Sequence, residues 1–248
     1  MYRFYVTPEQ IRDEKIEIVG EDVNHIRNVL RMRRGEKVVL CDGDGTDYIC
    51  ELAQTEGKSV IADILEKKAS ETELPVKLVL FQGMPKKDKM ELIIQKAVEL
   101  GAAEIIPVIT RRTIVKTDEG KEEKKLQRWQ AIAESAAKQS ERGRIPQVGR
   151  ILTWKEALAR MKQFDYNGIL YENARGMKPT AEFVKKAINA ASIGILVGPE
   201  GGFEECEVEQ AVEAGAERLS LGSRILRTET AGFTMLSTLM LSVECSRD

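Results

Sequence analysis

The sequence is short of the residues that build most metal and nucleophile sites. Its 248 residues include 1 histidine and 4 cysteines. His25 alone cannot form a His-x-x-His metal site, and a Ser-His-Asp triad would need that one ring. We therefore predict no metal, interpret His25 as a packed or capping imidazole, and expect acid–base chemistry to come from carboxylates, lysines or bound water.

Disulfide and membrane signals are also missing. Cys41, Cys50, Cys206 and Cys245 lie far apart and form no Cys-x-x-Cys pair, so we expect reduced and mostly buried thiols. No run approaches the roughly 18 consecutive apolar residues of a membrane span. Met1–Lys15 has no apolar core of the signal-peptide type. These absences predict a cytoplasmic protein that does not contact the membrane.

Basic and acidic residues nearly balance, 38 against 40, but they are unevenly distributed. Residues 25–37 hold five basic residues against one acidic residue, and residues 111–150 hold eleven against six. Residues 200–217 contain seven acidic residues and no basic one. Such separation is expected of a protein that meets a polyanion on one face. For Lys121–Arg128 we favour the alternative, a solvated helix face with i,i+4 pairs.

The first 70 residues or so are predicted to be β-rich. Short apolar runs are separated by turn signals such as Asp42-Gly43-Asp44-Gly45, and Asp22–Met32 has the spacing of one helix. The runs are Lys37–Leu40, Tyr48–Leu52 and Ser59–Leu65. A small barrel that carries one helix fits this pattern. The charged stretch Glu66–Glu73, closed by Pro75, is interpreted as the linker.

After Pro75, apolar strands alternate with amphipathic helices, which predicts an α/β domain with a parallel sheet covered on both faces. The predicted strands are Lys77–Phe81, Glu104–Ile109, Tyr166–Leu170, Ile193–Val197 and Arg218–Leu221. The predicted helices are Lys89–Leu100, Glu122–Ser140, Trp154–Lys162, Thr180–Ala190, Glu205–Ala214 and Thr230–Val243. The last helix is almost wholly apolar or small, so we expect it in the core and also at an oligomer interface.

Ligands of an open parallel sheet bind beyond the carboxyl ends of its strands, and two segments in that position are unusual. Gly198-Pro199-Glu200-Gly201-Gly202 has three glycines, where an ordinary turn needs one, and it matches neither the dinucleotide fingerprint nor the Walker A motif. Leu221–Thr230 contains Arg224 and Arg227. Helix capping accounts for Thr228 or Thr230 and for Glu229, but not for the arginines.

Two further loops are weaker candidates. Gln82–Lys89 carries lysines that can hold phosphates or lie in solvent, and Glu172 with Asn173 follows a predicted strand. Glu204, Glu205 and Glu207 are interpreted as stabilisers of a helix's first turn.

The loops together resemble a known family. The segments that carry the resemblance are Gly198–Phe203, Leu221–Ala231, Gln82–Glu91, Ile94–Gly101, Glu134–Ser140 and His25–Arg31. In this order they are similar to the bacterial rRNA methyltransferases that modify N3 of a specific uridine in 16S rRNA, members of the SPOUT superfamily. The resemblance spans nearly the whole chain. It implies a PUA-like, RNA-binding β-barrel over residues 1–72 and an α/β methyltransferase domain with a deep trefoil knot over residues 73–248.

The resemblance also implies a binding site for S-adenosyl-L-methionine (SAM), held in a bent conformation. The matching positions are Leu196, Val197, Gly198, Pro199, Glu200, Gly201, Gly202, Leu221, Gly222, Ser223, Ile225 and Leu226. Arg227 is expected to stabilise the uracil anion, because a guanidinium stays charged and directs its N–H groups at oxygens. Glu229 or Glu172 is expected to accept the N3 proton or to orient the base.

The expected partners are 16S rRNA of the small ribosomal subunit and a second copy of the chain, joined through the knot domain so that two protomers share the substrate cleft. Residues expected to hold RNA phosphates are Arg27, Arg31, Arg111, Arg112, Lys116, Lys138 and Arg142. Two alternatives remain open: a SPOUT 2′-O-methyltransferase of tRNA or rRNA, and a non-catalytic RNA-binding factor of ribosome assembly.

Overall fold

The computed structural model describes residues 1–113 and 119–247. The chain divides into two compact units, which are described separately. The first comprises Met1–Glu73 and Ala137–Ile145, and the second comprises Leu74–Ala136 and Pro146–Asp248. The prediction of a β-rich part followed by an α/β part is confirmed.

The first unit is built on a six-stranded sheet in the order β1-β4-β5-β6-β3-β2. Neighbouring strands are antiparallel, except that β1 pairs with β4 in parallel. Its elements are β1 (Tyr2–Tyr5), η1 (Pro8–Gln10), β2 (Ile11–Arg12), β3 (Lys15–Ile18), α1 (Glu21–Asn24), η2 (His25–Val29), β4 (Lys37–Cys41), β5 (Thr46–Gln54) and β6 (Val60–Ala69). Alternate side chains of these strands, such as Ile16, Val38 and Leu52, are fully buried in one core.

The single helix predicted over Asp22–Met32 is wrong in its details. After the four residues of α1 the backbone widens into the π-helix η2, in which the Leu30 N–H donates to the His25 carbonyl at 2.9 Å. Arg31 then adopts a left-handed φ of 54°, which ends the helix. The wider turn leaves Val29 64% exposed while Ile26 is fully buried, so apolar spacing alone misjudged which side chains share a face.

The linker predicted over Glu66–Glu73 is also wrong in part, because β6 continues to Ala69. Its outer end pairs with β5 as far as Thr46 opposite Ala69. The charged side chains there are mostly exposed, while the backbone groups of the two strands satisfy one another. The many charged residues of this segment therefore led to its interpretation as a linker, although it is a solvent-exposed part of a β-strand pair.

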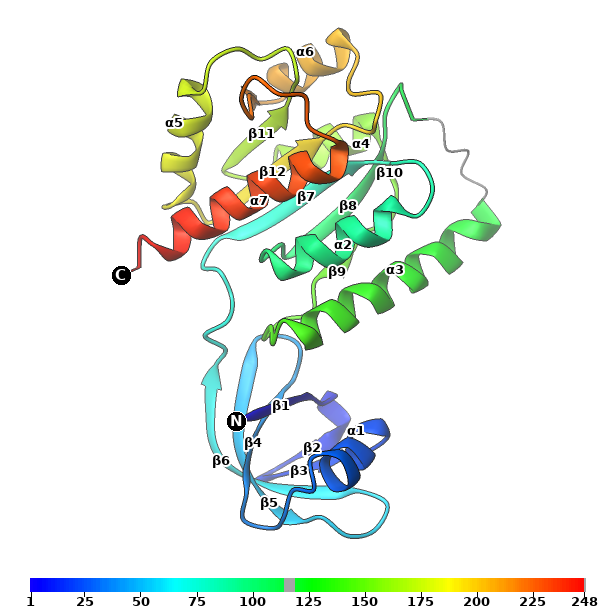
Figure 1. Cartoon of the computed structure of the whole chain (residues 1–248), viewed down its shortest axis with the longest axis vertical. Coiled ribbons are helices and arrows are strands. Elements are labelled where there is room, and N and C mark those ends of the chain that lie inside the picture. The colour runs from blue at the N-terminus through cyan, green and yellow to red at the C-terminus, as the bar shows by residue number, and fades with distance from the viewer. Residues whose placement is uncertain (114–118, 248) are drawn as a thin grey trace. The chain divides into compact units, whose positions relative to one another are not determined.

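The second unit contains a seven-stranded sheet in which every pair of neighbours is parallel (Figure 1). The order is β10-β8-β7-β12-β11-β13, with β9 also beside β8. The strands are β7 (Lys77–Gly83), β8 (Glu104–Ile109), β9 (Gln147–Val148), β10 (Leu152–Thr153), β11 (Tyr166–Leu170), β12 (Ser192–Val197) and β13 (Ala216–Leu219). The helices are α2 (Lys89–Glu99), α3 (Glu119–Gln139, whose last residues belong to the first unit), α4 (Trp154–Met161), α5 (Lys178–Ala187), α6 (Glu205–Glu213) and α7 (Thr228–Glu244).

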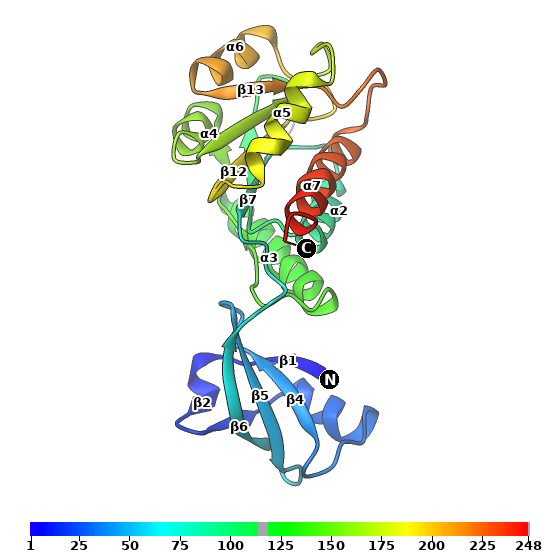
Figure 2. The ribbon, with the colours of Figure 1, turned by 90° about the vertical axis from the view of Figure 1, so that its left-hand side faces the viewer.

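Helices cover both faces of this sheet, as predicted. Figures 1 and 2 show α2, α5 and α7 on one face and α4 and α6 on the other. Along β7, Val79 and Phe81 pack toward α4 and α6, while the intervening Leu78 and Leu80 are equally buried. Helix α7 buries one face, including Met235, and leaves Leu241 52% exposed.

The parallel arrangement brings the carboxyl ends of the strands to one edge of the sheet. Strands β7, β12, β11 and β13 end at Gly83, Val197, Leu170 and Leu219, and the segments that follow them meet there. The trefoil knot implied by the resemblance stays a prediction. In the part of the chain that the structure describes, no helix is long and apolar enough to cross a bilayer.

Candidate functional site

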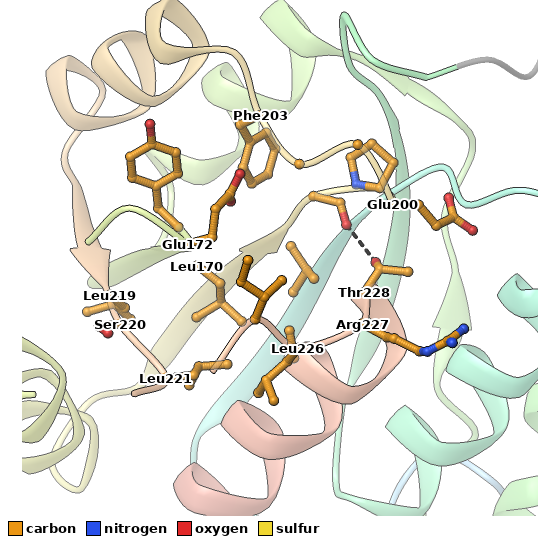
Figure 3. A pocket seen from close by; sticks show the side chains of 18 of the residues that line it. Leu170, Glu172, Glu200, Phe203, Leu219, Ser220, Leu221, Leu226, Arg227 and Thr228 are labelled. Carbon is orange, nitrogen blue, oxygen red and sulfur yellow. Dashed lines mark hydrogen bonds between the residues drawn. The ribbon is translucent and has the colours of Figure 1, made fainter. Parts of the chain in front are cut away.

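A cavity of about 440 Å³ opens at the carboxyl edge of the parallel sheet (Figure 3). Two loops form most of its wall. The glycine loop, residues 198–203, follows β12, and the arginine loop, residues 221–227, leads into α7. The ends of β11, β12 and β13, together with Lys89 of α2 and with Thr228 and Ala231 of α7, complete the lining.

The glycine loop makes a tight turn and packs closely against two neighbouring segments, at Gly202 and at Gly83. Gly202 has a φ of 67° and donates its N–H to the Pro199 carbonyl at 2.9 Å. A Cβ at Gly202 would lie 2.6 Å from Oε1 of Glu172, and a Cβ at Gly83 would lie 2.6 Å from Cδ of Pro199. Gly83 therefore needs glycine for space, because the atoms it would meet include the backbone N of Pro199. Gly202 needs glycine for its backbone conformation, and a Cβ there would push the flexible carboxylate of Glu172 aside.

Arg112 braces the far side of the glycine loop. Its Nε donates to Oε1 of Glu204 at 2.8 Å, and its Nη1 donates to the Gly201 carbonyl at 2.6 Å. The hydrogen bond from Arg112 lowers the pKa of the Glu204 carboxyl below its ordinary value. Glu204 also forms a capping box with Glu207 at the start of α6, so the prediction that these two acids stabilise the helix's first turn is confirmed.

Lys89 connects the glycine loop to the first turn of α7. Its Nζ lies 3.2 Å from Oε1 of Glu200 and 3.3 Å from Oε2 of Glu229. Partial burial opposes ionisation of Glu200, but the backbone N–H groups of Glu200 and Lys86 and the Lys89 ammonium lower its pKa below the ordinary value. Desolvation likewise opposes the Lys89 charge, while its bonds to both carboxylates raise its pKa. The Lys89 ammonium thus bonds carboxylates from two segments at once.

A buried hydrogen-bond path forms part of the cavity wall, which Gly198 and Thr228 both line. The Thr228 hydroxyl donates to the Gly198 carbonyl at 2.6 Å and accepts from Nε2 of Gln82 at 2.9 Å. Thr228 is the first residue of α7, and Arg227 is its N-cap without a side-chain cap bond. The prediction that Thr228 or Thr230 caps this helix is therefore wrong, because the Thr228 hydroxyl is used across the loops instead.

Most residues predicted to bind the cofactor line this cavity. These are Val197, Gly198, Pro199, Glu200, Gly201, Gly202, Leu221, Gly222, Ile225 and Leu226. Leu196 lies below the cavity, fully buried in the sheet, and Ser223 lies outside the lining. Of the three residues predicted to be catalytic, Arg227 and Glu172 line the cavity, and Glu229 does not.

Several lining residues were not singled out in the sequence. Leu170, Tyr171, Leu219 and Ala231 complete the wall. The first three lie at the ends of β11 and β13, so the rule that ligands bind beyond the carboxyl ends of parallel strands could have identified them.

The wall of the cavity combines an apolar region with charged ends. In Figure 3, Leu170, Leu221 and Leu226 form the apolar part, with Glu172 beside Phe203 at one end and Arg227 near Glu200 at the other. A ligand that carries charges at two ends of a flat or apolar body fits such a cavity.

The predicted RNA-binding residues fall in both units. Arg27, Arg31 and Lys138 are exposed in the first unit. The Arg27 guanidinium donates to the Gly57 carbonyl, and Lys138 lies 6.0 Å from the centre of the Tyr5 ring. Arg111 and Arg112 are exposed in the second unit. Lys116 lies outside the described residues.

Arg142 is a correction to the predicted set. Its side chain is 5% exposed, and its guanidinium pairs with both carboxylate oxygens of Glu73 at 3.3 and 2.5 Å. A guanidinium so enclosed has its donors turned to the protein and does not meet a phosphate. Arg142 instead stabilises the turn at Gly143, because the Gly143 N–H donates to the same Glu73 carboxylate.

The cysteines and acidic residues give little sign of other chemistry. All four cysteines are free; Cys41 and Cys50 are buried, whereas Cys206 is partly exposed and Cys245 is exposed. Burial raises the pKa of Cys41 to about 11 and that of Cys50 to about 12, so both stay as thiols. Within residues 1–113 and 119–247 no three metal-ligating side chains gather.

Comparison with known proteins assigns both parts of the chain. Residues 72–240 match the RNA methyltransferase domain family, and residues 18–65 match the RNA methyltransferase PUA domain family. The ribosomal RNA small subunit methyltransferase E of Bacillus subtilis is 38% identical, over 100% of this chain and 99% of its own length.

Solved structures agree with this likeness. The ribosomal RNA small subunit methyltransferase E of Neisseria gonorrhoeae, bound to S-adenosyl methionine, is 35% identical with a TM-score of 0.79 over 97% of both chains. A methyltransferase of Legionella pneumophila in complex with SAM is 32% identical with a TM-score of 0.77 over 96% of both chains. The chain therefore belongs to the RNA methyltransferase family that includes the ribosomal RNA small subunit methyltransferases E.

Proposed function

We propose that the protein transfers a methyl group from SAM to N3 of a uridine in the 16S rRNA of the small ribosomal subunit. The observation that carries the proposal is the cavity between the glycine and arginine loops, which Arg227 lines at the positive end of α7. Two relatives support it: both are named ribosomal RNA small subunit methyltransferase E, and one of them was solved with S-adenosyl methionine bound.

The residues present fit SAM. The glycine loop exposes backbone where a side chain would intrude, and a Cβ at Gly222 would meet no atom within 4 Å, so the arginine loop also leaves open space. Leu170, Leu221 and Leu226 offer an apolar surface for the adenine, and Glu172 offers a carboxylate to hydroxyl or ammonium groups. When bound, SAM supplies an electrophilic methyl group on a sulfonium.

Arg227 would favour the reactive form of the substrate. Uracil N3 carries a proton at neutral pH and becomes a good nucleophile only when it loses that proton, with the charge spread over O2 and O4. A guanidinium remains protonated and can donate to such oxygens, and the N-terminus of α7 adds a partial positive charge beside it. Both groups stabilise an anion more than the neutral base.

Of the two carboxylates predicted to receive the proton, we propose Glu172. Glu172 lines the cavity, whereas Glu229 lies outside the lining and is bonded to Lys89. A carboxylate already bonded to an ammonium outside the cavity is not placed to reach a base bound inside it. Glu229 would then hold Lys89 and the first turn of α7 in place.

The two units would divide the work of binding RNA and SAM. We propose that residues 1–72 form a PUA-like, RNA-binding domain and residues 73–248 a SAM-binding and dimerisation domain. Arg27 and Arg31, with Lys138, Arg111, Arg112 and Lys116, would contact phosphates, which positions RNA without reading its sequence. A pairing of two α7 helices over the exposed face at Leu241 would make the homodimer, and sedimentation of the purified protein checks this.

The proposal is tested on small subunits that lack the modification, with SAM and purified protein, by mass spectrometry of the nucleosides. The expected product is 3-methyluridine. Arg227→Ala should lower kcat by roughly 10²–10³, as loss of a charge-stabilising donor does, while Arg218→Ala, an exposed arginine on β13 outside the cavity, should leave it unchanged.

Three results would contradict the proposal. A ribose 2′-O-methyl product would favour the related 2′-O-methyltransferase activity. Absence of calorimetric heat with millimolar SAM would favour a non-catalytic assembly factor. Full turnover by Arg227→Ala would leave the SAM site in place but remove Arg227 from the mechanism.

A further inference from the structure

We propose that Gln82 and Thr228 are positioning residues for methyl transfer: their buried hydrogen-bond path ties the Gly198 carbonyl to the start of α7, and so fixes the SAM pocket and Arg227 relative to one another. The inference rests on the proposed function and names two residues that set the geometry of its site. Neither is assigned a contact with substrate.

The direction of each bond in the path follows from its donors. Nε2 of Gln82 donates to Oγ1 of Thr228 at 2.9 Å and to the Gly83 carbonyl at 2.9 Å. The Thr228 hydroxyl must then use its one hydrogen for the Gly198 carbonyl, at 2.6 Å. Gln82 is fully buried and Thr228 is 6% exposed, so water does not compete for these groups.

The path joins three segments that are distant in the sequence and that build the cavity together. Gln82 lies near the end of β7, Gly198 begins the glycine loop, and Thr228 directly follows Arg227. At the same crossing, a Cβ at Gly83 would lie 2.7 Å from the backbone N of Pro199. The end of β7 and the glycine loop therefore pack closely, and the Thr228 hydroxyl joins the start of α7 to both, so losing its bonds would let the Arg227 turn shift against the glycine loop.

The buried side-chain amide of Gln82 costs the protein some folding free energy. Oε1 of Gln82 is buried with no hydrogen-bond partner among the described residues. An apolar side chain in this place would avoid that cost, since an unpaired buried acceptor destabilises the folded state. The amide is therefore explained by its two donated bonds, which an apolar side chain cannot make.

A second buried amide provides a matched control. Asn167 on β11 also has a buried oxygen without a partner in the described part of the chain, and its Nδ2 donates to the Met161 carbonyl at 2.8 Å. It does not line the cavity. Replacing it tests the loss of a buried amide in the same sheet without touching the path.

The experiment compares Thr228→Val, Thr228→Ser, Gln82→Met and Asn167→Leu in the full chain. The measurements are Tm, the calorimetric Kd for SAM, and kcat and KM on small subunits. We expect Thr228→Val and Gln82→Met each to weaken SAM binding about tenfold and to lower kcat at saturating SAM about tenfold, because each leaves buried partners unpaired. Thr228→Ser keeps the hydroxyl and should recover both within about threefold. Asn167→Leu should lower Tm with an unchanged Kd and kcat.

The inference is overturned if Thr228→Val and Gln82→Met lower only Tm, as Asn167→Leu does, because the path then supports the fold alone. It is also overturned if Thr228→Ser is as impaired as Thr228→Val. If Thr228→Val does not fold, Thr228→Ser and Gln82→Met decide the question. Failure of the wild-type protein to bind SAM would instead refute the proposed function, so the two failures are distinct.

Discussion

The two loops that enclose the cavity are held very differently. The glycine loop is bonded along its length, from Gly198 to Thr228, from Glu200 to Lys89 and from Gly201 to Arg112, and Phe203 at its end is 2% exposed. In the arginine loop the side chain of Ile225 is 87% exposed, and residues 222–224 are exposed as well.

The contrast assigns the two halves of the site different roles in binding. The glycine loop is pre-organised, so little free energy is spent on ordering it when a ligand enters. The arginine loop exposes the apolar side chain of Ile225 to solvent, which a ligand or a second chain can cover, and the ordering of the loop must be offset by such contacts. The glycine loop should therefore contribute most of the affinity for SAM, and the arginine loop should become ordered only when a ligand or a second chain covers it.

Alanine at Gly202 and at Gly222 tests this difference most strongly. Both glycines have positive φ, 67° and 103°, so alanine strains either one by about 1–3 kcal/mol. At Gly202 the new Cβ would lie 2.6 Å from Oε1 of Glu172 and would push that flexible, cavity-lining carboxylate aside, whereas at Gly222 it meets nothing within 4 Å. We expect Gly202→Ala to weaken SAM binding at least about tenfold more than Gly222→Ala, measured by calorimetry.

Gly222→Ala serves as the control for backbone strain. If both variants bind SAM equally, the collision with Glu172 is relieved at no cost, and the pre-organisation of the glycine loop does not determine affinity.

The glycine loop could be predicted from the sequence because its signal is local. Three glycines directly after an apolar strand indicate close backbone contact, and the strand itself was predicted within one residue of β12. The partners that hold the loop could not be predicted in the same way. Arg112 and Gly201 are 89 residues apart, and only the fold brings them together.

Arg142 shows the same limit for charged residues. A basic residue in a basic stretch predicts a phosphate contact when nothing else is known. Its partner, Glu73, lies 69 residues earlier in the chain and within the stretch interpreted as a linker. Burial and pairing are properties of the folded chain, so the sequence alone could not separate Arg142 from exposed arginines such as Arg27.

Lys89→Met gives the second largest expected effect, because it removes the connection between the glycine loop and the first turn of α7 while keeping the length of the side chain. Glu200 and Glu229 then lose a shared partner at 3.2 and 3.3 Å. We expect SAM binding to weaken about three- to tenfold, since the pair is partly exposed and such contacts are worth about 1 kcal/mol. Differential calorimetry should show a modest fall in Tm.

Lys86→Met is the matched control for this variant. Lys86 contacts Glu200 through its backbone N–H, at 3.1 and 3.2 Å, and the substitution leaves that bond in place. Equal losses in the two variants would show that general surface charge, rather than the Lys89 connection, determines affinity.

Acid should loosen the glycine loop before it unfolds the protein, and this is the smallest effect expected. The pKa of Glu200 lies below its ordinary value of 4.5, so protonation is harder in the folded chain than in the unfolded one. The stabilisation from its ionised form is then complete above about pH 5 and is lost as the pH falls through the lowered pKa. Calorimetric SAM affinity should be constant from about pH 8 to 5 and should decline below that, by about twofold to fivefold at pH 4.

Glu200→Gln separates this titration from other acid effects. The variant cannot hold Lys89 with a charge at any pH, so it should bind SAM more weakly at pH 7 and lose less affinity on acidification. Glu213→Gln, an exposed position on α6, should follow the wild-type profile. If Glu200→Gln also follows that profile, the acid response arises from another group. The ionic contacts of the glycine loop then do not explain why that loop contributes more to SAM affinity than the arginine loop.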